Sequence, residues 1–105
     1  MVPLKYDAAS SFRKGLALIK KDDRWGVIDK MGKVVVWLEY DEVGHFSEGL
    51  AMAKENDKWG YIDKTGRRII PFIYDEVKPF SGGSAFVIIN GYSHVIDTVG
   101  RTENL

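Results

Sequence analysis

The apolar and glycine positions of this chain recur with one fixed spacing of 34 residues. Three copies align without a gap, and the recurring residues include Tyr6, Tyr40 and Tyr74; Phe12, Phe46 and Phe80; Asp29, Asp63 and Asp97; and Gly32, Gly66 and Gly100. A fixed period of this length indicates a tandem-repeat protein. We therefore expect a single domain over residues 1–105, with copies at about 6–39, 40–73 and 74–105 and a partial third strand at 2–5.

Each copy contains the pattern of a β-hairpin. In the middle copy, an apolar run at 50–54 is followed by a run of strand-forming residues at 58–63. The pairs between the two runs are Asp22-Asp23, Asn56-Asp57 and Asn90-Gly91 in the successive copies. These residue types tolerate the positive φ angles of a two-residue type I′ turn. Such a turn places Lys54 opposite Trp59 and Ala53 opposite Gly60.

A second turn follows each hairpin. Asp63 begins it and Gly66 ends it, so the carboxylate can accept a backbone hydrogen bond and the glycine can take a left-handed conformation. Third strands are then expected at 33–38 and 67–72, and residues 40–49 form a connector. The pattern therefore predicts a three-stranded meander in each copy, with no helix.

Both faces of each predicted hairpin are apolar. One face carries large residues such as Trp59 and Tyr61, and the other carries small ones such as Ala51 and Ala53. Two apolar faces need cover on both sides, and neighbouring copies can supply it. We expect an all-β protein whose meanders stack as an open, solenoid-like array. The alternative is a closed pseudo-threefold ring, in which Val2–Tyr6 completes the last copy.

Composition narrows the classes of function. The chain has 15 basic and 15 acidic residues and no cysteine. The neutral balance argues against nucleic-acid and membrane binding, and disulfides and thiolate chemistry are excluded. No stretch resembles a signal peptide or a membrane-spanning helix, so we expect a cytoplasmic protein unless the chain is a piece of a longer one.

Several blocks of the sequence, all in register with the 34-residue period, together form a recognisable repeat motif. They are residues 46–51, 58–66, 69–71 and 74–77, together with the pairs Trp25-Gly26 and Trp59-Gly60. These blocks closely resemble the WG repeat of bacterial proteins, over almost the whole chain. The third copy departs from it, since Ser93-His94 replace the Trp-Gly pair. The resemblance implies a β-rich module that occurs in tandem, is usually regarded as a binding unit, and brings no catalytic residue.

The repeated residues have structural interpretations. Trp25 and Trp59 are expected to pack in the framework, although exposed indoles could instead stack on sugars. The repeated tyrosines are expected to pack with their hydroxyls bonded locally, and the repeated aspartates to stabilise turns rather than bind calcium. His45 and His94 fall at different repeat positions without a third ligand. We expect no metal, no cofactor and no catalytic residue.

Two residues depart from the repeat in a way that suggests binding. Trp37 and Leu38 stand where the middle copy has Pro71 and Phe72. An exposed Trp37 would anchor a partner, whereas a Trp37 folded onto the core would be structural. We therefore expect a non-enzymatic protein-binding or scaffold module, with a glycan- or cell-envelope-binding module using the repeated aromatics as the alternative. Open sheet edges also predict self-association.

Overall fold

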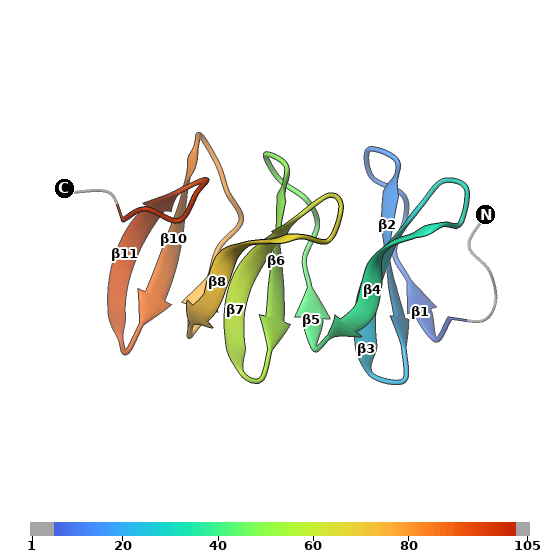
Figure 1. The fold of residues 1–105 in the computed structure, drawn as a ribbon, viewed down its shortest axis with the longest axis horizontal. Coiled ribbons are helices and arrows are strands. Elements are labelled where there is room, and N and C mark those ends of the chain that lie inside the picture. Colours follow the sequence, from blue (N-terminus) through green and yellow to red (C-terminus); the bar gives the residue numbers. More distant parts are fainter. Residues whose placement is uncertain (1–5, 103–105) are drawn as a thin grey trace.

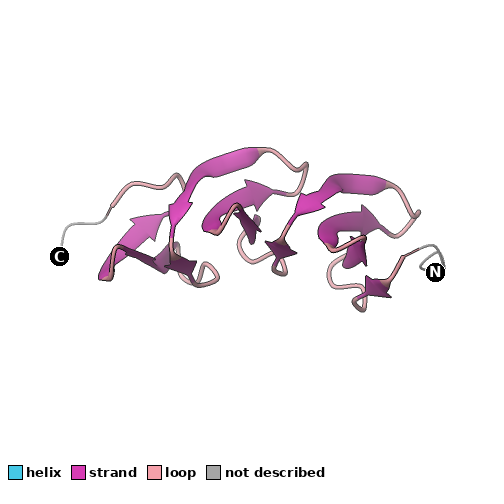
Figure 2. Ribbon diagram, turned by 90° about the horizontal axis from the view of Figure 1, so that it is seen from below, coloured by secondary structure: helices cyan, strands magenta, loops and turns pink. Residues whose placement is uncertain are grey.

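The protein is an elongated row of three antiparallel β-sheets (Figure 1). The structure is a computed structural model that describes residues 6–102, with extents of 47 × 26 × 19 Å. Its strands are β1 (Ala8–Ala9), β2 (Leu16–Lys21), β3 (Arg24–Asp29), β4 (Val34–Tyr40), β5 (Glu42–Val43), β6 (Leu50–Glu55), β7 (Lys58–Asp63), β8 (Arg68–Tyr74), β9 (Glu76–Val77), β10 (Ser84–Ile89) and β11 (Tyr92–Asp97). All the regular structure in the described residues is therefore strand (Figure 2).

The sheets follow one another in chain order. Their strand orders are β1-β2-β3-β4, β5-β6-β7-β8 and β11-β10-β9. The first and last sheets lie at opposite ends of the row (Figure 1), so the predicted open array is confirmed and the ring alternative is wrong. The segment 2–5, expected to be a partial third strand, lies outside the described residues.

The predicted hairpins form in the predicted register. Lys54 pairs with Trp59, and Ala53 pairs with Gly60. The turn residues Asn56 and Asp57 have φ angles of 53° and 67°, as a type I′ turn requires. Local turn chemistry therefore determines which side chains share a face of each sheet.

The aspartate turns form as expected. Oδ1 of Asp63 accepts hydrogen bonds from the backbone N–H groups of Thr65, at 2.9 Å, and Arg67, at 3.0 Å. The Thr65 hydroxyl and these amides hold the pKa of Asp63 below its usual value. Asp29 and Asp97 accept the same pair of backbone hydrogen bonds in their own turns.

Two details of the meander differ from the expectation. The connectors add a short strand on the far side of each hairpin, where β5 pairs with β6, so the two complete sheets have four strands rather than three. In the third sheet, the described residues contain no third strand beside β11. Thr102 makes only an isolated bridge to Ile96 there.

The sheets stack large face on small face. At the first junction, Leu18 and Val27 of the first repeat pack with Ala51 and Ala53 of the second. The second junction repeats the arrangement with larger side chains, because Leu50, Tyr61, Ala85, Val87 and Ile96 pack together there. Buried apolar surface is the main driving force for folding, so these two junctions hold the array together.

The glycine of each Trp-Gly pair is required because the third strand leaves no room for a side chain there. A Cβ atom built on Gly26 would lie 2.5 Å from the Val36 carbonyl oxygen, and one on Gly60 would lie 2.7 Å from that of Ile70. Neither glycine has a positive φ angle, so the close approach of the third strand is the cause. The third copy has His94 at this position, and the described residues place no third strand against it.

The repeated tyrosines pack as predicted, but one hydroxyl does not follow the prediction. Tyr40 is buried and its ring stacks on Phe72 at a centroid distance of 5.8 Å. Its hydroxyl makes no hydrogen bond of normal length and angle among the described residues, so the expected local hydrogen bond does not form at Tyr40, although the Arg68 guanidinium interacts with the hydroxyl. The guanidinium of Arg68 also lies 5.4 Å from the ring centroid, where it interacts with the ring face.

Candidate functional site

The indole of Trp37 projects into solvent. Trp37 is 73% exposed on β4, while Val36 beside it is buried in the first junction. Leu38 is only partly exposed and packs over Gly26 on the opposite side of the strand. The structure therefore separates the two residues that the sequence suggested together, and Trp37 is the more exposed of the two.

The two tryptophans of the Trp-Gly pairs belong to the stacked framework. Both are half-buried and pack against the clusters of the first and second junctions. The ammonium of Lys20 lies 5.7 Å from the ring centroid of Trp25, and that of Lys54 lies 5.8 Å from Trp59. Each indole thus has packing contacts and a cation over its ring, which favours the framework interpretation over a sugar platform.

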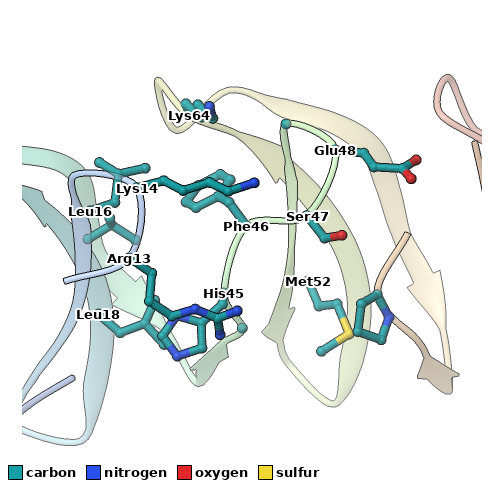
Figure 3. A pocket seen from close by; sticks show the side chains of 14 residues that line it. Arg13, Lys14, Leu16, Leu18, His45, Phe46, Ser47, Glu48, Met52 and Lys64 are labelled. Atoms are coloured by element: carbon teal, nitrogen blue, oxygen red, sulfur yellow. The ribbon is translucent and has the colours of Figure 1, made fainter. Parts of the chain in front are cut away.

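A cavity of about 560 Å³ lies between the first and second repeats. Its apolar wall consists of Leu16, Leu18, Val27, Phe46, Met52 and Pro79, and its polar rim includes Arg13, Lys14, His45 and Lys64 (Figure 3). The turn before β2 supplies Arg13 and Lys14, and Lys14 reaches across the cavity toward the second repeat. Sequence reasoning did not find this site.

The charges at the cavity are unbalanced. Arg13, Lys14 and Lys64 form no ion pair with any residue between 6 and 102. The Glu48 carboxylate also borders the cavity, but it accepts a hydrogen bond from the backbone N–H of Gly83 at 2.8 Å and points away in Figure 3. Burial, with a smaller effect from Arg13, lowers the pKa of His45 and favours its neutral form.

The second junction shows why a cavity opens at the first. The Ser47 hydroxyl donates to the Phe80 carbonyl at 2.6 Å, and the Tyr61 hydroxyl donates to the Lys78 carbonyl at 2.6 Å. Burial raises the pKa of Tyr61, so this hydroxyl keeps its proton.

The residues at the matching places of the first copy cannot make these bonds. Arg13 replaces Ser47, Lys14 replaces Glu48, and Val27 replaces Tyr61. The smaller valine leaves space, and the two cations cannot reproduce the serine and glutamate contacts. A comparison of the copies at these three positions is the sequence signal that would have pointed to the cavity.

Other site chemistry is sparse in the described part of the chain. Residues 6–102 contain no cluster of three His, Cys, Asp or Glu side chains that could hold a metal ion. No helix between residues 6 and 102 is long and apolar enough to cross a membrane.

Comparison with families of known proteins identifies the repeat. A family model described as a WG containing repeat matches residues 1–25, 25–59 and 59–92. The matched segments meet at Trp25 and Trp59, which begin the Trp-Gly pairs. Neither the curated proteins nor the solved structures contain a match.

Proposed function

This chain belongs to the family of WG containing repeats, and from that premise we propose that it is a non-enzymatic module that binds a protein partner. The repeated aromatic, glycine and aspartate residues are used in stacking, close approach and turns. Binding is therefore assigned to surface residues that differ between the copies.

The exposed indole of Trp37 carries this proposal. A tryptophan offers a large apolar surface, and binding hot spots are enriched in tryptophan. Pairing with β3 holds β4 on both sides of Trp37, since Tyr40 pairs with Trp25 and Val36 pairs with Val27, and the register shifts between these two pairs. The indole is thus presented from an ordered strand, which lowers the entropy lost on binding.

The surroundings of Trp37 indicate what kind of partner surface would fit. Glu39 lies two residues from Trp37 in the irregular stretch of β4 between the paired residues Val36 and Tyr40, and Val35 packs against the core of the first junction. Val35 is half-buried and Glu39 is exposed. A partner with an apolar recess beside a basic group would match this surface.

Site-specific photo-crosslinking tests the proposal. A photo-reactive amino acid at the exposed position 39, two residues along β4 from Trp37, would capture the partner, which is then purified for direct affinity measurement. We expect Trp37→Ala to weaken binding about 30-fold or more, the size of a hot-spot effect of about 2 kcal/mol. Ile73→Ala, on the exposed side of β8, is the matched control and should leave affinity within about twofold. Equal affinities for the wild type and Trp37→Ala would refute the proposal.

The glycan or cell-envelope alternative has less support. It needs repeated aromatic rings with a free face, and Trp25 and Trp59 are half-buried with lysines over their rings. Saturable binding of an oligosaccharide that Trp59→Ala abolishes would favour that alternative instead.

A further inference from the structure

The cavity between the first and second repeats is a site that the protein-binding proposal does not use. Trp37 does not line it, so the two surfaces can be tested separately. Its volume of about 560 Å³ falls in the range typical of small-molecule pockets, roughly 300–1,000 Å³.

We propose that this cavity binds a small carboxylate with an aromatic or other bulky apolar body. The apolar part would contact Leu18, Val27 and Phe46, which line the interior. Removing such a surface from water supplies affinity without directional contacts. The carboxylate would lie at the rim, beside the unpaired cations.

Charge distribution supports an anionic ligand. The five ion pairs of the described residues use other cations: Arg24, Lys54, Lys58, Arg68 and Arg101. Arg13, Lys14 and Lys64 gather at one cavity and form no ion pair within residues 6–102, although the whole chain is neutral. Clustered cations beside apolar walls concentrate an attractive potential for anions.

The second junction provides an internal precedent for the carboxylate position. There the carboxylate of Glu48 accepts a hydrogen bond from the backbone N–H of Gly83. The matching N–H group in the first junction belongs to Gly49, which lines the cavity and has no hydrogen-bond partner among residues 6–102. Lys14 stands where the second junction has its carboxylate, so a ligand can provide the missing anion.

The same comparison gives a precedent for the apolar body. The ring of Tyr61 fills the second junction and lies edge-on to Phe80, with a centroid distance of 4.7 Å. Val27 and Phe46 occupy the matching places in the first junction. A ligand ring beside Phe46 would replace the tyrosine ring that this junction lacks.

Amide chemical-shift titration with naphthalene-2-carboxylate tests the site. We expect saturable shifts at Gly44, Phe46 and Gly49, and an affinity at least tenfold weaker for the neutral analogue 2-naphthalenemethanol. Equal affinity for the two probes, or shifts confined to other residues, would overturn the proposal.

A variant that converts the first junction to the second provides the structural test. Arg13→Ser, Lys14→Glu and Val27→Tyr together should reduce naphthalene-2-carboxylate affinity at least tenfold. Lys14→Glu alone should reduce the affinity for naphthalene-2-carboxylate at least threefold. Lys14 lies at an exposed turn position, so this variant is expected to fold and serves as the test if the triple variant does not. Lys21→Glu makes the same charge change at the other end of β2 and should have no effect. Undiminished binding by the Lys14→Glu variant would refute the site.

Discussion

Replacing Gly60 by alanine tests the idea that the Trp-Gly pair exists to admit the third strand. The added methyl group would lie 2.3 Å from Cδ1 of Phe72 and 2.7 Å from the carbonyl oxygen of Ile70. Cβ atoms in proteins essentially never approach other atoms closer than 3.0 Å, so β8 must move or β7 must distort. The backbone at Gly60 has no positive φ angle, so alanine adds no conformational strain of its own.

The expected cost follows from two opposing effects. Forcing an extra methyl group into a packed site costs about 1–3 kcal/mol, and contact with a backbone oxygen places Gly60 at the upper end. Alanine also lowers the entropy of the unfolded chain relative to glycine, which returns about 0.5–1 kcal/mol. We therefore expect a net loss of about 2 kcal/mol in the free energy of unfolding. For a domain of this size, that loss lowers the midpoint temperature by roughly 8–16 °C.

Urea and thermal unfolding, followed by circular dichroism, measure this effect. His94→Ala is the matched control because His94 holds the same repeat position where the described residues place no third strand. His94 is half-buried and pairs with Val87, so His94→Ala should lower the free energy of unfolding by about 1 kcal/mol or less, clearly less than Gly60→Ala. If Gly60→Ala is as mild as His94→Ala, the close approach of the third strand does not explain the glycine.

Three further predictions follow from the hydrogen bonds, charges and open surfaces of the array. Tyr61→Phe should lower the free energy of unfolding by about 1 kcal/mol because it removes the hydrogen bond to the Lys78 carbonyl. Tyr40→Phe should be neutral or stabilising because it removes a buried hydroxyl that makes no normal hydrogen bond in the described residues. Equal losses of stability for the two variants in urea unfolding would contradict this prediction. Asp63 has a lowered pKa in the folded protein, so the folded state binds fewer protons than the unfolded state. The associated stability is present above pH 3.8 and is lost as the pH falls below that value. Asp63→Asn should flatten this part of the stability profile in acid titrations, and an unchanged profile would count against this role of Asp63. Phe86 of the third repeat is 64% exposed, so we expect the protein to self-associate with increasing concentration in sedimentation velocity. Phe86→Lys should reduce this self-association, and a monomer at all concentrations would exclude it.

The repeat architecture was readable because it rests on short-range rules. Paired turn residues such as Asn56 and Asp57 set the hairpin register, and that register set the large and small faces. The turn aspartates have their partners two and four residues away, so their role was also visible in the sequence. In each case the cause and its effect lie within one hairpin or one turn.

The rest depends on contacts between repeats. The added strand β5 has two residues, too few for a periodic pattern. The exposure of Trp37 could not be decided from the sequence because an edge tryptophan can fold inward or outward. The cavity lies where Val27 faces the second repeat. The second junction has the Tyr61 ring and the hydrogen bonds of Ser47 and Tyr61 at the matching places, and the first junction lacks them. A single copy of the repeat does not reveal this difference.

The large-on-small stacking gives the molecule a direction, since every unit offers one kind of surface toward the N-terminal side and another toward the C-terminal side. Recombination between copies that stay in phase would add or remove whole units while every seam still joins matched surfaces. Such a protein can change its length without redesigning its interior, and selection is then free to modify one seam at a time.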